Sequence, residues 1–295
     1  MYLLIYFFVY LISLLPWRLL YFISDIIALL LQHVFKYRVK VVKQNLAIAF
    51  PQKTAKERQE IANEFYQQFA DSFIETFKLI SISDKNFEKR FSSNSEVLHK
   101  LYATGQSVQI MAGHFFNWEF ANWGAAKYGK YPFIAVYMPL SNPHFNKIIL
   151  KLRKRYGSIM IPATKFKSQF HKYASQGAYA MALAADQNPG NSLSAYWLPF
   201  FGRLTPFVKG PEKGALLNNT AQVFVHFYRV KRGYYHSEYE VMTTSPNYFK
   251  DGQLTALFVK TLEEKIKAKP ANYLWTHRRW RSEYDATKHE KLLVH

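Results

Sequence analysis

The first 35 residues constrain the fold more than any other part of the chain, because they are almost entirely apolar. Two apolar runs meet around Pro16, and only Arg18 and Asp25 carry a formal charge. The first run, residues 2–15, is shorter than the roughly 20 residues that a membrane-spanning helix needs, although a proline can also kink a longer membrane helix. A spanning helix, an interfacial helix and a buried amphipathic hairpin are therefore all compatible with this segment.

The flanks of the apolar segment indicate how it is placed in the cell. No Lys or Arg precedes the first run and no small-x-small site follows it, so it is not predicted to be a cleaved signal peptide. Four basic residues follow it, and such residues favour the cytoplasmic side of a bilayer: Lys36, Arg38, Lys40 and Lys43. We predict a membrane anchor over residues 1–35 and, because no linker or repeat interrupts the remainder, one domain over residues 36–295.

The charge and the cysteine content restrict the chemistry. The chain has 39 Lys and Arg against 20 Asp and Glu, a formal charge of +19, which predicts an anionic partner. It contains no Cys, which excludes disulfides, a thiolate nucleophile and cysteine metal sites. A nucleic-acid-binding protein would explain the charge but not the apolar N-terminus, so we do not predict nucleic acid as a partner.

Beyond the anchor, apolar strand patterns alternate with helical patterns. A capping box at Thr54–Glu57 predicts the start of a long helix whose apolar side chains recur every four residues from Ile61 to Phe77. Strands are predicted at residues 107–112, 132–138, 157–161, 178–184 and 221–228, and the clearest helices between them at 145–156 and 165–176, the latter with Thr164 as its cap. This alternation predicts a layered α/β fold with a largely parallel central sheet.

The strongest candidate for chemistry is the segment from His114 to Glu119. The sequence lacks a nucleophile elbow, a phosphate-binding loop, a dinucleotide fingerprint and a zinc-protease motif. His114 directly follows an apolar strand, and Asn117, which is also a candidate for substrate binding, is placed to cap the next helix. Ligands bind outside the carboxyl ends of parallel strands, so we predict that His114 is a general base and that Glu119 folds back onto its imidazole. A structural histidine that caps a turn is the alternative.

An uninterrupted basic stretch follows this segment. Between Glu119 and Asp186 there is no acidic residue, but there are ten Lys and Arg. Such a field concentrates anions beside the proposed base. We predict that Arg153 and Arg155 bind a phosphate, because guanidinium groups can grip phosphate bidentately.

Two further groups of polar residues are candidates for substrate binding. Asp186 and Gln187 follow an apolar strand and are predicted to lie at the same sheet edge as His114, although an Asp can also serve only to cap a loop. A group near the C-terminus suits either an interfacial anchor or a head-group contact: His277, Arg278 and Arg279, between Trp275 and Trp280.

Taken in order along the chain, these motifs resemble the late acyltransferases of lipid A biosynthesis, within the lysophospholipid acyltransferase-like superfamily. The hallmark is a His and an acidic residue separated by four residues, here His114 and Glu119, in the context Asn117-Trp118-Glu119. The other similar features are the apolar N-terminus, residues 45–51, the basic residues 153–155 before Gly157, Asp186-Gln187, Thr205, residues 210–212 and residues 273–279.

The resemblance implies a membrane-bound α/β acyltransferase on the cytoplasmic face of a Gram-negative inner membrane. Such an enzyme moves an acyl chain from acyl carrier protein to a hydroxyl of a phosphorylated glycolipid, a lipid A precursor, without a cofactor, a metal or an acyl-enzyme. Two alternatives stay open: an acyltransferase for a lysophospholipid or an aminolipid, and a non-catalytic, membrane-tethered protein that binds anions.

Overall fold

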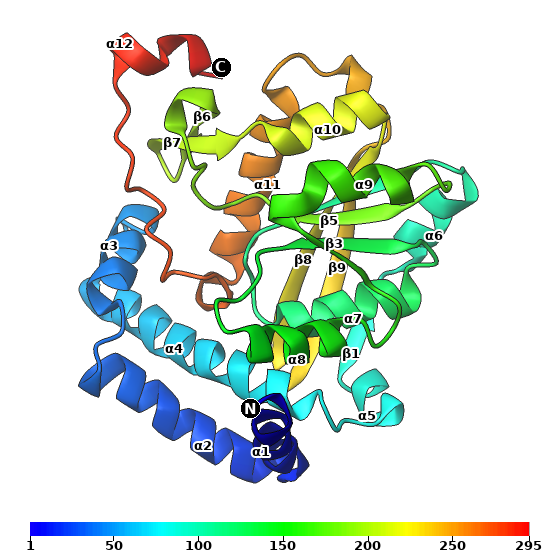
Figure 1. The fold of residues 1–295 in the computed structure, drawn as a ribbon. Helices are drawn as coiled ribbons and strands as arrows, with labels where there is room; N and C mark the ends of the chain where they lie inside the picture. Colours follow the sequence, from blue (N-terminus) through cyan, green and yellow to red (C-terminus); the bar gives the residue numbers. More distant parts are fainter. Residues whose placement is uncertain (295) are drawn as a thin grey trace.

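The computed structural model describes residues 1–294 and shows a layered α/β fold. Its central sheet has seven strands in the order β1-β9-β8-β2-β5-β3-β4 (Figure 1). The five predicted strands are confirmed with small boundary shifts, as β2 (Val108–Ala112), β3 (Phe133–Tyr137), β4 (Ile159–Pro162), β5 (Ala180–Ala184) and β8 (Ala221–Lys231). These five strands are mutually parallel, so the predicted fold class is confirmed.

The other strands were not predicted from the sequence. β9 (Tyr234–Thr243) forms an antiparallel hairpin with β8, and the short β1 (Phe91–Ser93) pairs in parallel with β9 at the edge of the sheet. Strands β6 (Ala195–Phe200) and β7 (Arg203–Val208) form a separate antiparallel hairpin.

Helices cover the sheet and connect its strands. Besides those discussed below, they are α3 (Val39–Ala49), α5 (Asp84–Glu88), α6 (Glu96–Ala103), α10 (Gly210–Asn218), α11 (Gln253–Ala268) and α12 (Ala286–His289). The two helices predicted from residues 145 and 165 are α8 (Pro143–Arg153) and α9 (Phe166–Ala174). Thr164 does not cap α9, because it lies inside a 3₁₀ turn, Ala163–Lys165, that leads into this helix.

The longest helix, α4 (Ala55–Lys78), begins with the predicted capping box. The Thr54 backbone N–H donates to the Glu57 carboxylate at 2.6 Å, and the Glu57 N–H donates to the Thr54 hydroxyl at 3.2 Å. Phe65 and Phe69 are buried as the four-residue pattern predicts, whereas Phe73 is exposed. Residues spaced four apart move gradually around the helix, because an α-helix has 3.6 rather than four residues per turn.

The apolar N-terminus forms two helices, α1 (Tyr2–Leu14) and α2 (Trp17–Leu29), and α2 continues into a π-helical turn, Leu30–Val34. They lie next to α4 at one edge of the molecule, away from the sheet (Figure 1). Trp17–Val34 is long and apolar enough to cross a membrane, but only 22% of it is buried in the protein. The two helices therefore do not form a fully buried hairpin, because one face of the pair packs on the protein and the other face is exposed.

Candidate active site

His114 lies where the sequence places it, just beyond the carboxyl end of β2. Gly113 separates it from the strand, and a Cβ on Gly113 would come within 2.6 Å of the Leu262 side chain, so a larger residue in this turn would require Leu262 to move. Asn117 then caps helix α7 (Trp118–Tyr128), because its side-chain oxygen accepts the backbone N–H of Glu119 at 3.0 Å. The predicted strand, turn and helix cap around His114 are confirmed.

The partner of the His114 ring is Asp186. Strands β2 and β5 are adjacent and parallel, with Ala112 opposite Ala184, so the residues that follow them meet at one edge of the sheet. The Asp186 carboxylate lies 2.6 Å from Nδ1 of His114 and accepts the His114 backbone N–H at 3.1 Å. Because a carboxylate can only accept, Nδ1 carries the proton and Nε2 is left free to accept one.

The electrostatics of this pair favour its charged form. Burial raises the pKa of Asp186, but the charge of His114, the hydrogen bonds from its ring and backbone N–H, and that from Tyr273 outweigh burial and lower the pKa to about 2. Burial lowers the pKa of His114, whereas the charge and hydrogen bond of Asp186 raise it, and the net shift is upward. The aspartate thus stays ionised at any physiological pH and makes the imidazole a stronger base.

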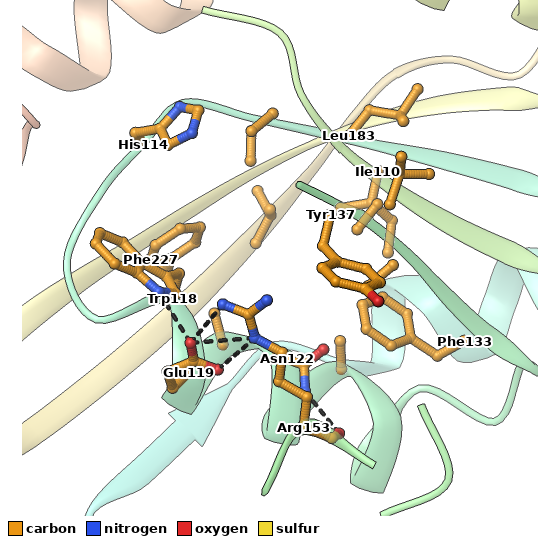
Figure 2. Close-up of a pocket in the computed structure, with 18 of the residues that line it drawn as sticks. Ile110, His114, Trp118, Glu119, Asn122, Phe133, Tyr137, Arg153, Leu183 and Phe227 are labelled. Atoms are coloured by element: carbon orange, nitrogen blue, oxygen red, sulfur yellow. Dashed lines mark hydrogen bonds and ion pairs between the residues drawn. The ribbon is translucent and has the colours of Figure 1, made fainter. Parts of the chain in front are cut away.

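The prediction that Glu119 folds back onto the imidazole is wrong. Glu119 instead pairs with Arg153 at the end of α8: Nε and Nη2 of Arg153 lie 2.6 to 3.1 Å from the two carboxylate oxygens. The Trp118 indole N–H also donates to Glu119, at 3.1 Å. The reason is geometric, since Glu119 lies in the first turn of α7 and its side chain points toward α8 rather than back toward the strand. Figure 2 shows this group on the opposite side of the pocket from the His114 ring.

A cavity of about 560 Å³ lies between these two groups. His114, Gln187, Trp118, Glu119 and Arg153 line it. Most of its remaining wall is apolar (Figure 2) and includes Ile110, Ala112, Phe133, Ala135, Tyr137, Ala182, Leu183, Val225 and Phe227. An apolar cavity with a few converging polar groups is typical of a small-molecule site, and its lining fits a hydrocarbon chain.

Arg153 and Arg155, which were predicted to bind a phosphate, lie in different surroundings in the structure. Arg153 lines the cavity, and it is held there because Asn122 of α7 donates to its backbone carbonyl at 3.0 Å. Arg155 lies outside the cavity, where it pairs with the exposed Asp84 at 2.8 Å and stacks on the Trp123 ring. The two guanidinium groups therefore do not form one phosphate clamp. Arg153 is the last residue of α8 and Arg155 lies in the turn that follows, so the two side chains reach different neighbours.

The three C-terminal candidates, His277, Arg278 and Arg279, also lie in different surroundings. His277 accepts the Asn188 backbone N–H at 3.2 Å, and burial lowers its pKa to about 4 despite the nearby charge of Asp186. Arg279 is buried and donates to the Asn188 side chain and to the Pro206 carbonyl, which is a structural role. Arg278 instead lines a basic groove of about 1180 Å³, whose other cationic residues are Lys36, Arg38, Lys40, Lys43 and Arg281.

Sequence reasoning missed a buried carboxylate behind the site. Glu75 of α4 accepts hydrogen bonds from Asn117 (3.1 Å), Tyr235 (2.5 Å) and Tyr21 of α2 (3.0 Å). Burial and the charge of Asp71 raise the pKa of Glu75 to about 7, although these three hydrogen bonds lower it. Nothing in the sequence marks Glu75, because its partners are 42 to 160 residues away.

We expect this carboxylate to make stability depend on pH. The pKa of Glu75 is raised in the folded state, so its proton is released more readily on unfolding, and the free energy of unfolding falls as pH rises from about 4.5 through about 7. Glu75→Gln can retain the three hydrogen bonds without the charge. At pH 8 it should raise the free energy of unfolding relative to the wild type by on the order of 2 kcal/mol.

Thermal unfolding of the detergent-solubilised protein at pH 5 and pH 8 measures this difference. Glu60→Gln, on the exposed face of the same helix, is the control and should change nothing. Glu75→Ala leaves three hydrogen-bond donors without an acceptor and should lower the free energy of unfolding at both pH values by about 3 kcal/mol or more. A Glu75→Gln protein with the same pH dependence as the wild type would contradict the raised pKa.

The fold and the site together define a class of protein. A largely parallel sheet with a His–Asp pair at its carboxyl edge, beside an apolar cavity, is the arrangement of an α/β enzyme that acts on a substrate with an apolar chain. Within residues 1–294, no group of three or more His, Asp or Glu side chains is arranged to hold a metal ion.

Comparison with known proteins identifies the family of this chain. The sequence model of the bacterial lipid A biosynthesis acyltransferases matches residues 1–282. The chain is 25% identical over 275 residues to the lipid A biosynthesis palmitoleoyltransferase of Escherichia coli (strain K12), which covers 91% of this chain and 87% of that protein. A lipid A biosynthesis acyltransferase of Shigella flexneri is similar to the same extent. The chain belongs to the bacterial lipid A biosynthesis acyltransferase family, and it is an acyltransferase. The resemblance seen in the sequence motifs is confirmed.

Proposed function

We propose that this enzyme transfers a fatty acyl chain from acyl carrier protein to a hydroxyl of a phosphorylated lipid A precursor, on the cytoplasmic face of the inner membrane. The observation that carries the proposal is the His114–Asp186 pair at an apolar cavity of about 560 Å³. The family match favours a lipid A precursor over the lysophospholipid and aminolipid alternatives, and it argues against a non-catalytic protein.

In the proposed mechanism, Nε2 of His114 is the general base. It takes the proton of the acceptor hydroxyl while that oxygen attacks the thioester carbonyl of the donor. The tetrahedral intermediate then collapses, the carbon–sulfur bond breaks, and the imidazolium returns its proton to the departing thiolate. Asp186, rather than Glu119, fixes the Nδ1–H tautomer and stabilises the imidazolium.

Arg153 is the cation proposed to act inside the cavity. Nε and Nη2 are paired with Glu119, and Nη1 makes no hydrogen bond with any residue in the described part of the chain. This nitrogen can donate to a phosphate oxygen or to the developing oxyanion. Glu119 then acts by positioning Arg153. The two residues of the His-x₄-Glu motif therefore have separate roles, His114 as the base and Glu119 as the partner of the cation.

The proposed partners are both acidic, and the basic groove lined by Arg278 supplies positive charge beside His277. Acyl carrier protein and a phosphorylated glycolipid would each be attracted to such a surface. We keep residues 1–35 as the proposed membrane anchor and residues 36–295 as the proposed catalytic domain.

The direct test is transfer by the purified enzyme in detergent. Acyl chains on acyl carrier protein and on coenzyme A are offered with a lipid A precursor, with a lysophospholipid or with an aminolipid as acceptor. We expect the acylated lipid A precursor to form, with the carrier-protein donor preferred. Equal or faster acylation of the lysophospholipid or aminolipid would contradict the proposed acceptor, and a preference for coenzyme A would contradict the proposed donor.

The pH dependence of the reaction tests the role of Asp186. Because the pKa of His114 is raised, kcat/KM should increase with pH with a midpoint above the usual histidine value of about 6.5. Asp186→Asn removes the charge that raises this pKa. The midpoint should move down, and kcat/KM should fall by at least about 100-fold, because the tautomer is no longer fixed. Asp84→Asn, an exposed aspartate, is the control. An unchanged midpoint in Asp186→Asn would exclude His114 as the titrating base.

Membrane attachment through the N-terminal helices is tested by charging their exposed face. Phe22 and Leu29 of α2 are 62% and 59% exposed. Phe22→Glu with Leu29→Glu should release the protein from membranes in a high-salt wash, because salt screens the attraction that basic residues alone provide. Leu217→Glu with Tyr248→Glu, two exposed side chains of the catalytic domain, should leave the protein in the membrane pellet. Salt-resistant sedimentation of the α2 variant would show that the anchor lies elsewhere.

A further inference from the structure

Both ends of helix α1 are fixed to the catalytic domain. Near its N-terminus, Lys147 of α8 lies 4.5 Å from the centre of the Tyr2 ring. At its C-terminus, the Lys78 ammonium of α4 donates to the Ser13 and Leu15 carbonyls at 2.8 and 2.9 Å. A helix of 13 residues is about 20 Å long, too short to cross the roughly 30 Å hydrocarbon core. Since neither end leaves the catalytic domain, α1 does not span a bilayer.

Helix α2 together with its π-helical turn, Trp17–Val34, is long enough to span a membrane, but the inner face of this segment is polar and bonded to the catalytic domain. The Ser24 hydroxyl donates to Asp71 at 2.7 Å, and Asp25 accepts from Arg232 at 2.5 Å. Arg232 also pairs with Asp71 at 2.7 Å. These contacts lie at the middle of α2, and further bonds flank them on both sides, from Tyr21 to Glu75 and from Gln32 to Asn63.

The outer face of α2 is apolar and has no partner in the described residues. Its exposed side chains recur at helical spacing, as Leu19, Phe22, Ile26 and Leu29, and the exposed Leu30 of the π-helical turn follows them. The outward side chains of α1 are also apolar, and they include Leu3, Leu4, Phe7, Phe8, Leu11 and Leu14. Basic residues border the two helices, with Arg18 in the first turn of α2 and Lys36, Arg38, Lys40 and Lys43 beyond α2. An apolar stripe with a cationic border matches the acyl chains and anionic head groups of a lipid leaflet.

A spanning orientation of α2 conflicts with its polar contacts. If α2 stood along the bilayer normal, Asp71, Glu75 and Arg232 would enter the hydrocarbon core with it, because they are bonded to its middle turns. Breaking those bonds instead would strand buried charges on α4 and on the turn between β8 and β9. Charged side chains at the bilayer centre are strongly unfavourable. Lying flat avoids both costs, because the polar face keeps its partners and the apolar face meets lipid.

We infer that α1, the turn at Pro16 and α2 with its π-helical turn lie in the plane of the membrane interface, embedded in a single leaflet, and do not cross the bilayer. This inference rests on the membrane residence proposed above and specifies its geometry. It also places the active site, because α1 packs against α8, the helix that ends at Arg153 (Figure 1). The cavity is then one helix away from the leaflet that delivers the lipid acceptor.

The depth of two labels on α2 tests this orientation. The chain has no cysteine, so Leu19→Cys and Leu29→Cys each give a single site for a nitroxide label without disturbing the polar face. The labelled proteins are bound to vesicles of phosphatidylethanolamine and phosphatidylglycerol, and depth is read from collisions with oxygen and with a water-soluble nickel complex. Gln52→Cys, exposed before α4, is the aqueous control.

A helix in the interface plane should give the two labels the same depth to within about 5 Å, both near the boundary of head groups and acyl chains. A spanning helix should separate them by about 15 Å, since ten residues rise 1.5 Å each. A separation of that size would overturn the single-leaflet orientation while leaving membrane residence intact. Failure of the unlabelled wild-type protein to bind the vesicles would overturn membrane residence itself, and acyl transfer measured in detergent would still test the proposed reaction separately.

Discussion

Replacing His114 with alanine is expected to lower kcat/KM for acyl transfer by about 10³-fold or more, because the variant lacks the group that accepts the proton of the attacking hydroxyl. The side chain is 30% exposed and lines the cavity, so its removal opens space to solvent rather than creating a hole in the core. Activity is measured with the donor and acceptor of the proposed reaction, and folding is checked by thermal unfolding.

Two further variants make the result specific to His114. His114→Gln can still donate an amide N–H to Asp186, but it cannot act as a base, so it should be as inactive as the alanine variant while remaining folded. His171→Ala, at an exposed position on α9, should retain full activity. Normal turnover by a folded His114→Gln protein would show that another group is the base.

The second large effect is expected from the Arg153–Glu119 pair. The Glu119 side chain is only 3% exposed, so Arg153→Gln leaves a buried carboxylate with the Trp118 indole as its remaining partner. We expect the free energy of unfolding to fall by about 2 kcal/mol or more, because breaking one side of a buried ion pair strands the other. We also expect kcat/KM to fall at least tenfold, because the cavity loses its cation.

A double-mutant cycle separates the interaction between Glu119 and Arg153 from the effect of each side chain alone. Glu119→Gln with Arg153→Gln removes both charges and should recover much of the lost stability without recovering activity. Arg155→Gln is the matched control two residues away, and its partly exposed pair with Asp84 predicts an effect of about 0 to 1 kcal/mol. Equal effects at Arg153 and Arg155 would show that the basic stretch acts only as a diffuse field.

The parts of the fold that were predictable are those encoded by local patterns. Strands β2, β3, β4, β5 and β8 are rich in apolar residues, as is typical of parallel strands covered on both faces, and the central strand β2 is buried along its whole length. Strand β9 lies near the sheet edge and carries Glu238 and Glu240, so it lacks such a pattern and was missed. The polar inner face of α2 was missed for a similar reason, since its partners belong to distant elements.

The site was predictable in its position but not in its pairing. Strand ends place His114 and Asp186 at one edge, yet only the strand order, with β5 beside β2, brings them within 2.6 Å. Closeness in sequence favoured Glu119 as the partner of His114, and that inference failed because the first turn of α7 directs Glu119 toward α8. Long-range pairing across a sheet cannot be obtained from spacing along the chain.

Mass spectrometry of lipid A from the source organism measures whether His114 catalyses the acylation of a lipid A precursor. Deleting the gene should remove one acyl chain from lipid A, and the wild-type gene should restore it. The His114→Ala gene should fail to restore it, although its product is present in the membrane at the wild-type level. Unchanged lipid A in the deletion strain would contradict the proposed acceptor, and full restoration by His114→Ala would contradict the proposed role of His114.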